Sequence, residues 1–372
     1  MNNLQNQNSN EPNQNTNEQN QNANEPDQSA AAEGKTAVGA AKRKTVLSGM
    51  QPTGTPSLGN YLGALTNWVK MQDEYDCIYF IADLHAITLR QVPADLRKNT
   101  RNLFTLFLAV GLDPEKSIIF CHSSVPQHAE LTWVLNCFTY IGELGRMTQF
   151  KDKSQKHDDN INAGLFTYPV LMAVDILLYQ ADYVPVGEDQ RQHLELTRDL
   201  AMRFNNIYGD VFTVPEPYIT KATGKIMGLQ NPDKKMSKSE SDNENNVIYL
   251  MDPPNVIRNK IKRAVTDSGD EVRYSEEKPG IMNLLNIYGA FTGKTPAEAE
   301  KEFAGVGYGD FKLAVADAVA ARLEPIQTRY KELSEDKTYI DRTLKEHTER
   351  AAALAERTVG KVYRKIGFLR AR

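Results

Sequence analysis

From residue 45 onward, short apolar runs alternate with longer segments of helical periodicity. The apolar runs lie at residues 45–49, 77–82, 117–122 and 183–186. The helical patterns lie at residues 61–72, 94–110, 127–140 and 189–204. Short apolar strands that alternate with helices favour a parallel sheet covered by helices. We therefore predict an α/β fold that binds ligands at the carboxyl ends of its strands.

After residue 242 the pattern becomes purely helical, which indicates a second domain. Helices are expected at residues 254–264, 280–291, 295–302, 310–330 and 336–364. The segment that precedes them is rich in Gly, Lys, Ser, Asp and Asn, a composition typical of a loop. The predicted organisation is an arm over 1–42, a sheet domain over 43–227, a loop over 228–242 and a helical domain over 243–372.

The arm differs from the rest of the chain in composition. More than half of its first 32 residues are Asn or Gln, and they include four acidic and no basic residues. With so little to bury, this segment is expected to be disordered. Its acids account for the whole net charge of −4, so the remainder is neutral and an anionic macromolecule must meet local basic patches.

Other features of the sequence exclude several classes of protein. The arm resembles neither a transit peptide nor a secretory signal, so we expect a cytoplasmic protein. The longest apolar stretch, residues 103–112, is too short to span a bilayer, which needs about 20 residues. Cys77, Cys121 and Cys137 are widely separated, so we expect inert or core thiols rather than a zinc site or disulfides.

A Gly-rich turn follows the first apolar run and leads into a helical pattern. It reads PTGTPSLGN from Pro52 to Asn60. The backbone N–H groups and positive dipole end of such a turn suit an anionic ligand. The same residues can equally form a plain strand-to-helix connection, and they match neither a Walker A loop nor a GxGxxG motif.

A Lys-rich string within the predicted loop is the second candidate phosphate site. It reads KKMSKS from Lys234 to Ser239. Its ammonium and hydroxyl groups can neutralise negative charge on a triphosphate and on departing pyrophosphate. A solvated charge run is the alternative that composition leaves open.

Residues 168–179, YPVLMAVDILLY, predict a helix whose apolar face carries a single carboxylate. Tyr168, Met172, Asp175 and Tyr179 recur at helical spacing and share this face. A buried carboxylate requires hydrogen-bond donors, and an indole N–H would supply one. The alternative is a helix packed on the core, with Asp175 satisfied by neighbouring protein groups.

The two phosphate strings together resemble the paired signatures of class I aminoacyl-tRNA synthetases. Most members carry HIGH where this chain has Ser57-Leu58-Gly59-Asn60, and the tryptophanyl branch tolerates that change by using the Gly-Asn pair. Residues 168–179 are similar to the specificity helix of the bacterial tryptophanyl-tRNA synthetase family. The resemblance covers residue 45 to about the C-terminus. It implies a Rossmann-like parallel-sheet catalytic domain and a helical tRNA anticodon-binding domain with a C-terminal helix.

The resemblance also implies roles for single residues. Lys235 and Lys238 would be catalytic. The implied ATP-binding residues are Gln51, Pro52, Thr53, Gly59, Asn60, Gly187, Glu188, Asp189, Ile226, Lys235, Met236, Ser237, Lys238 and Ser239. The implied tryptophan-binding residues are Tyr168, Met172, Asp175 and Gln190. Leu47 would lie beside the adenine, Asp189 also fits a helix N-cap, and His85 is interpreted as structural.

The activity that the resemblance implies is that of a tryptophan–tRNA ligase. Tryptophan would attack the α-phosphate of ATP, with Mg²⁺ bound through ATP rather than in a protein metal site, and would then pass to tRNA. Because no protein nucleophile is needed, catalysis should consist of positioning and charge neutralisation. The resemblance further implies a homodimer.

Two other functions stay open at this point. A tyrosine-activating relative is disfavoured by Met172, where tyrosyl enzymes would prefer Gln. A non-catalytic RNA-binding paralogue would be expected to lose the lysines or the Gly-Asn pair. Basic residues of the helical domain would contact tRNA phosphates, unless they are solvated helix faces. In one stretch these are Arg258, Lys260, Lys262 and Arg263.

Overall fold

The structure is a computed structural model, which describes residues 43–151, 161–218, 226–236 and 243–369. The chain divides into two units, Met1–Lys42 and Arg43–Arg372, and every described residue belongs to the second. The predicted arm therefore lies outside the described residues. The boundaries expected within the second unit, at residues 227 and 243, stay predictions.

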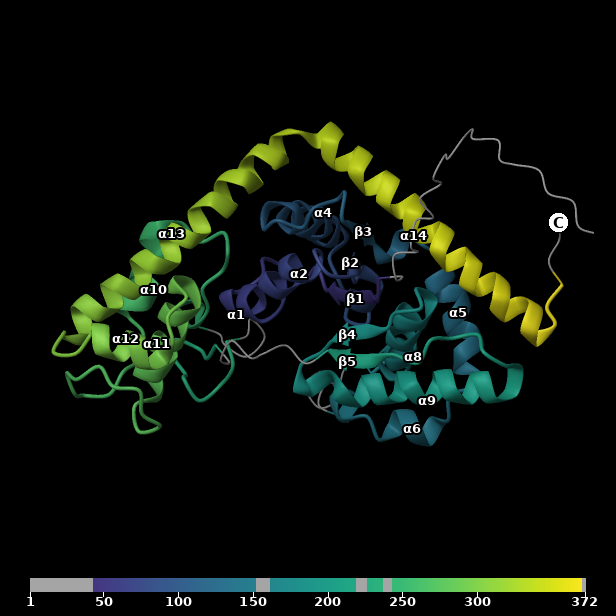
Figure 1. Cartoon of the computed structure of the whole chain (residues 1–372), viewed down its shortest axis with the longest axis horizontal. Helices are drawn as coiled ribbons and strands as arrows, with labels where there is room; N and C mark the ends of the chain where they lie inside the picture. The colour runs from purple at the N-terminus through teal and green to yellow at the C-terminus, as the bar shows by residue number, and fades with distance from the viewer. Residues whose placement is uncertain (1–42, 152–160, 219–225, 237–242, 370–372) are drawn as a thin grey trace, which may run out of the picture. The chain divides into compact units, whose positions relative to one another are not determined.

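Five parallel strands form one sheet in the order β3-β2-β1-β4-β5 (Figure 1). They are β1 (Thr45–Met50), β2 (Asp76–Ile81), β3 (Ser117–Cys121), β4 (Tyr183–Pro185) and β5 (Glu216–Tyr218). The first three strands progress outward, and the chain then returns to add β4 on the other side of β1. This order confirms the predicted α/β fold. Its reversal between β1 and β4 is the point at which open parallel sheets bind ligands.

Alternate residues of each strand face two separate apolar cores. On β2, Tyr79 packs in one core against Trp68, at 4.7 Å between ring centroids, while Phe80 belongs to the other core. In Figure 1 α4 (Pro93–Ala109) lies on one side of the strands, and α8 (Ala163–Leu178) and α9 (Arg191–Tyr208) lie on the other. The apolar runs are continuous rather than alternating because both faces of the sheet are covered.

The Gly-rich turn begins a helix, as predicted. Ser57 is the N-cap of α1 (Leu58–Asn60), and it forms a capping box with Asn60. The chain continues through a π-helical turn, η1 (Tyr61–Leu65), into α2 (Thr66–Met71). The helix expected over 127–140 is shorter than predicted: α5 (Gln127–Asn136) ends early, and α6 (Ile141–Gly145) begins just beyond the expected range.

The C-terminal part is helical, in agreement with the sequence pattern. Its helices are α10 (Pro254–Lys262), α11 (Pro279–Thr292), α12 (Pro296–Glu302), α13 (Tyr308–Glu335) and α14 (Lys337–Ile366). Proline stands in the first turn of α10, α11 and α12, where its missing N–H is not needed. Helix α13 packs against α10, α11 and α4, and α14 packs against β3 and α5. None of the helices in the described ranges has the length and apolar character that a membrane crossing requires.

Candidate functional site

Two adjoining cavities open where β1 and β4 end. Their volumes are about 410 Å³ and about 310 Å³, and we name them the first and second cavity. The residues that line both are Ser48, Gly49, Gln51, Pro185, Val186 and Gly187. Since all six come from the carboxyl ends of β1 and β4 or the residues just beyond, the site lies at the reversal of strand order. Ligands in the two cavities would meet at these residues.

Gly49 lines both cavities and packs directly against Phe80. A Cβ at this position would lie 2.5 Å from the ring of Phe80, a separation that real Cβ atoms do not adopt. Phe80 itself lines the second cavity. The absence of a side chain at Gly49 therefore lets β1 pack against Phe80 while its backbone stays open to ligands.

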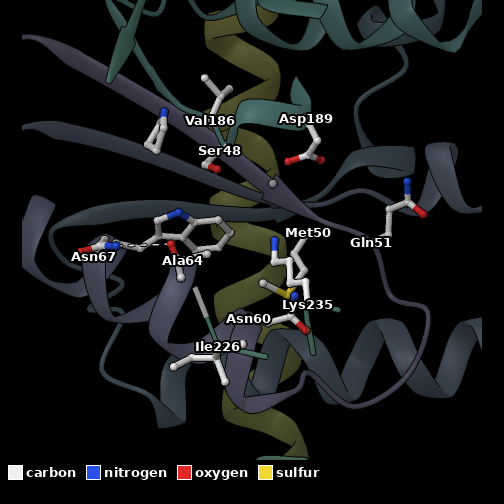
Figure 2. A pocket seen from close by; sticks show the side chains of 16 residues that line it. Ser48, Met50, Gln51, Asn60, Ala64, Asn67, Val186, Asp189, Ile226 and Lys235 are labelled. Atoms are coloured by element: carbon white, nitrogen blue, oxygen red, sulfur yellow. Dashed lines mark hydrogen bonds between the residues drawn. The ribbon is translucent and has the colours of Figure 1, made fainter. Parts of the chain in front are cut away.

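The first cavity brings the two phosphate strings together. Asn60 comes from the Gly-rich turn and Lys235 from the Lys-rich string, and Figure 2 shows both among the lining side chains. A Cβ on Gly59 would come 3.3 Å from the carbonyl oxygen of Met236. The backbone N–H of Met236 donates to the carbonyl of Ile226 at 2.9 Å, which brings Ile226 to the same place. Segments far apart in the sequence thus form one wall.

The predicted ATP-binding residues divide into three groups, with Glu188 apart from them. Those that line the first cavity are Gln51, Gly59, Asn60, Gly187, Asp189, Ile226 and Lys235. Pro52, Thr53 and Met236 neighbour lining residues without lining either cavity themselves. Ser237, Lys238 and Ser239 lie outside the described residues. Glu188 belongs to a short turn, η4 (Glu188–Gln190), which begins directly after Gly187.

Hydrogen bonds hold two polar side chains of the first cavity, Asn60 and Asp189, in place. The capping box uses Oδ1 of Asn60, which accepts from the backbone N–H of Ser57 at 3.0 Å, so Nδ2 can turn to a ligand. Asp189 accepts from Nε2 of Gln190 at 2.8 Å and from Gln149 at 3.3 Å. The interpretation of Asp189 as a helix N-cap is wrong, because Gln190 holds that position in α9.

The second cavity collects all four residues predicted for tryptophan. Tyr168, Met172 and Asp175 come from α8, and Gln190 comes from the start of α9. Asn162 caps α8 by accepting from the backbone N–H of Leu165 at 2.9 Å, which fixes where the helix begins. The further residues that line this cavity include Leu47, Phe80, Ala82, His85, Gln149, Ile176 and Val184.

Asp175 is 1% exposed and surrounded by histidines. Nδ1 of His128 lies 2.7 Å from Oδ1, and Nε2 of His85 lies 2.7 Å from Oδ2. Nε2 of His122 approaches Oδ1 to 2.8 Å, without the alignment of a hydrogen bond. Burial alone would raise the pKa of Asp175, but His122 and the hydrogen bonds from His128 and His85 hold it well below the usual range. The carboxylate is therefore ionised.

The histidines change two interpretations of the sequence. Protein groups bind Asp175, as the alternative of a core helix requires, but the carboxylate also lines the second cavity. His85, interpreted as structural, lines that cavity as well. His85 and His122 each follow a strand end, and this position is the signal that could have identified them. No sequence signal marked His128.

Leu47 and Tyr179 also differ from expectation. Leu47 lines the second cavity rather than the first, so it faces the apolar pocket and not the expected adenine position. Tyr179 does not line either cavity, and its hydroxyl lies 2.9 Å from Nε2 of His128. The reason is that Tyr179 stands just beyond α8, as its C-cap residue, where the helical path ends.

His85, His122 and Asp175 have the ligand types of a metal site. Their nitrogen and oxygen atoms are 2.7 and 2.8 Å apart, which is hydrogen-bonding distance. Two ligands on a tetrahedral zinc ion, each bound at about 2.1 Å, would be about 3.4 Å apart. The spacing is therefore that of a carboxylate in direct contact with two histidines rather than that of ligands around a metal ion.

Two of the three cysteines are buried. Burial raises the pKa of Cys77 to about 11 and that of Cys121 to about 12, so both are inert core thiols as expected. Cys137 is exposed instead.

The expectation that Lys260 contacts RNA is wrong, because this residue is 6% exposed. Its ammonium group donates to the Val247 carbonyl at 2.8 Å and to Asp252 at 2.7 Å.

Comparisons with known proteins agree with this geometry. The family model described as tRNA synthetases class I (W and Y) matches residues 40–324. The chain is 58% identical over 327 residues to a tryptophan–tRNA ligase of Clostridium tetani, covering 88% of this chain and 96% of the relative. A tryptophan–tRNA ligase of Clostridium acetobutylicum is 54% identical over 328 residues, which is 88% of this chain and 98% of the relative.

Solved structures give the same result. The tryptophanyl-tRNA synthetase of Mycoplasma pneumoniae superposes with a TM-score of 0.80 at 38% identity, over 88% of this chain and 98% of that one. The Campylobacter jejuni enzyme, complexed with ADP and tryptophan, has a TM-score of 0.76 at 35% identity, over 87% of this chain and 100% of that one. With a parallel sheet, paired phosphate strings and an acidic residue in an apolar cavity, the chain belongs to the tryptophan–tRNA ligase family of class I tRNA synthetases.

Proposed function

We propose that this chain uses ATP and Mg²⁺ to activate tryptophan as tryptophanyl-adenylate and transfers the tryptophan to tRNA(Trp). The observation that carries this proposal is the pair of adjoining cavities. One is lined by the two phosphate strings and the other by an ionised carboxylate among apolar side chains. Activation requires the carboxylate of an amino acid to meet the α-phosphate of ATP, and the shared residues of the two cavities provide a place for it.

ATP would occupy the first cavity. Lys235 supplies a positive charge there, and Asn60 and the backbone at Gly59 supply N–H donors, the groups that bind phosphates. Ile226 offers an apolar surface for the base. The structure of the Campylobacter jejuni relative with ADP and tryptophan supports this use of the fold.

Tryptophan would occupy the second cavity. Met172, Phe80 and Leu47 provide apolar surface for a ring. An ionised carboxylate has about four acceptor positions, two on each oxygen, and Oδ2 of Asp175 receives a hydrogen bond from His85 alone among the described residues. The remaining position suits the indole N–H. Gln190 would contact the amino or carboxyl group of the ligand.

The chemical step requires positioning and charge neutralisation. The tryptophan carboxylate attacks the α-phosphate, the bond to the β-phosphate oxygen breaks, and pyrophosphate leaves. Lys235, together with Lys238, would neutralise the charge that develops on pyrophosphate. Lys235→Ala should therefore lower the rate of activation far more than it raises the dissociation constant for tryptophan, and equal losses in both would contradict the role.

Mg²⁺ would enter with ATP. This ion prefers phosphate oxygens, waters and one or two carboxylates. Among the described residues that line the first cavity, Asp189 is the carboxylate, and it already accepts from Gln149 and Gln190. The residues thus fit an ion held mainly by the ATP phosphates, where it supplies positive charge. Asp189 would at most contact its hydration shell.

We also propose that the chain works in the cytoplasm, binds tRNA and forms a homodimer. Lys262 and Arg263 are exposed at the end of α10 and would contact tRNA phosphates.

Three large apolar side chains are exposed at the end of α5 and the start of α6: Trp133 at 72%, Tyr140 at 63% and Ile141 at 78%. Exposed apolar groups of this size mark interaction surfaces, and they support a homodimer. Trp133→Glu should yield a monomer by light scattering, whereas an unchanged mass would reject this surface.

The test of the proposed function is pyrophosphate exchange into ATP with each of the twenty amino acids and no tRNA. Exchange with tryptophan alone is expected. Exchange with tyrosine would transfer the assignment to the sister enzymes. The absence of exchange with any amino acid would favour the non-catalytic RNA-binding paralogue.

A further inference from the structure

The two oxygens of Asp175 have different surroundings. Oδ1 contacts both His128 and His122, at 2.7 and 2.8 Å, and neither of these histidines lines a cavity. Oδ2 contacts His85, which does line the second cavity. Oδ1 is therefore turned to the protein interior, and the open acceptor position lies on Oδ2. Something must keep the plane of the carboxylate in this orientation, because a partial rotation about its bond would turn Oδ1 away from His128 and Oδ2 away from the second cavity.

His128 is placed to hold the carboxylate of Asp175 in this orientation. Both of its ring nitrogens are engaged, since Nδ1 contacts Asp175 and Nε2 contacts the hydroxyl of Tyr179 at 2.9 Å. The ring is completely buried, and it packs at 6.0 Å from Phe120 and 4.1 Å from His122 between ring centroids. A ring in this position cannot turn away from the carboxylate without moving its neighbours.

The direction of the hydrogen bonds follows from Tyr179. Burial raises the pKa of its hydroxyl well above the ordinary value, so the group keeps its proton and can donate. If Tyr179 donates to Nε2 of His128, the ring hydrogen must stand on Nδ1, where it points at Asp175. The opposite tautomer would place a lone pair of Nδ1 against a carboxylate oxygen. The tyrosine hydroxyl and the carboxylate thus favour the same histidine tautomer, the one that holds Oδ1.

We propose that His128 and Tyr179 are positioning residues of the second cavity. In the chain Tyr179–His128–Asp175, the tyrosine reinforces the histidine tautomer that donates to Oδ1, and the histidine holds Oδ1 so that Oδ2 faces a ligand N–H donor. The second cavity thereby selects an aromatic ligand that carries an N–H group over one of the same shape without it. This inference rests on the proposed function, because it requires that an indole binds there.

Tyr179→Phe tests the inference, since it removes one hydroxyl and retains the ring. The readout is kcat/KM in pyrophosphate exchange for tryptophan and for the analogue with sulfur in place of the indole N–H. The wild type should prefer tryptophan strongly. In Tyr179→Phe the preference should fall by about tenfold, the effect of weakening one buried hydrogen bond. KM for tryptophan should rise, while KM for ATP and kcat should stay within about twofold.

Two further variants separate positioning from mere packing. In His128→Asn the side-chain amide nitrogen can occupy the place of Nδ1 and donate to Asp175, so it should retain most of the preference. His128→Leu should lose it. Tyr288→Phe is the matched control and should behave as wild type, because it removes the hydroxyl of a buried tyrosine that donates to Glu302 at 3.1 Å and belongs to the other apolar core.

A measurement without catalysis provides the second readout. The ¹⁵N chemical shifts of histidine rings distinguish the two tautomers, and His128→Asn identifies the signals of His128. The wild type should show hydrogen on Nδ1, and Tyr179→Phe should show a larger share of the other tautomer, because only the carboxylate then opposes it. A wild-type preference in Tyr179→Phe, or hydrogen on Nε2 in the wild type, would overturn the inference. Failure of the wild type to exchange with tryptophan would instead reject the proposed function, and the inference with it.

Discussion

Nδ1 of His347, on helix α14, accepts a hydrogen bond from the backbone N–H of Ile119 at 2.9 Å. Strand β3 is the outer strand of the sheet, so this N–H has no neighbouring strand to bind. A histidine of helix α14 therefore provides the hydrogen-bond acceptor that this backbone N–H lacks at the edge of the sheet. Burial, assisted by the charge of Arg350, lowers the pKa of His347 to about 4.

The stability of the protein should consequently depend on this histidine in mildly acidic solution. Below pH 6.5 the unfolded chain protonates His347, whereas the folded protein does not until about pH 4. The free energy of unfolding should therefore fall as the pH drops from 6.5 to 4, by about 3 kcal/mol in total. His347→Asn, which can present Oδ1 to Ile119, should remove this part of the pH dependence in urea unfolding. Parallel pH profiles of the two proteins would show that the histidine is not responsible.

Asn283 should control the wall of the first cavity. This residue on α11 is 2% exposed, and its amide pairs with both backbone groups of Met227, at 2.8 and 2.9 Å. Asn283→Leu leaves a partly buried N–H and C=O without these partners, which should lower the free energy of unfolding by about 2 kcal/mol. Because Met227 adjoins Ile226, KM for ATP should rise more than KM for tryptophan.

Steady-state exchange kinetics on the folded fraction provides the measurement for Asn283. The exposed Asn255 on α10 supplies the matched control, and Asn255→Leu should change neither stability nor KM. Equal increases of both KM values in Asn283→Leu would mean that the effect is not confined to the first cavity.

Gly49→Ala should impair activation through Phe80. The new methyl group would lie 2.5 Å from the ring, and such overpacking costs about 1–3 kcal/mol. The displaced ring would enter the second cavity, so KM for tryptophan should rise. Phe80→Leu in the same chain should restore much of the loss, and Gly145→Ala, where a Cβ meets nothing within 4 Å, should be neutral. A double variant as impaired as Gly49→Ala alone would argue against the steric explanation.

Neighbouring lysines of α10 should have opposite roles. Lys260→Met leaves Asp252 without its ion-pair partner in a largely buried position, so the free energy of unfolding should fall by about 3 kcal/mol. Lys262→Ala should leave unfolding unchanged, raise KM for tRNA and reduce the dependence of tRNA binding on salt. Thermal unfolding and aminoacylation at two salt concentrations separate these outcomes, and a normal tRNA response in Lys262→Ala would exclude this lysine from the interface.

The elements of the fold that were predicted have local causes. Strand β2 and helices α4 and α14 agree with their predicted limits within a few residues, because apolar spacing along one segment decides which face it can bury. Strand β5 was missed, since it has three residues, includes Pro217 and is stabilised by pairing with β4. The π-helical turn of η1 likewise has no counterpart in the periodicity of its residues.

The candidate site shows the same division. The sequence by itself determined the parallel sheet, the two phosphate strings and the helix that carries Tyr168, Met172 and Asp175, because each depends on spacing within one segment. Only the tertiary structure decided that His85, His122 and His128 surround Asp175, and that Lys260 is buried. Those contacts join segments far apart along the chain. The partners of a buried charge depend on how such segments pack, and no local pattern records them.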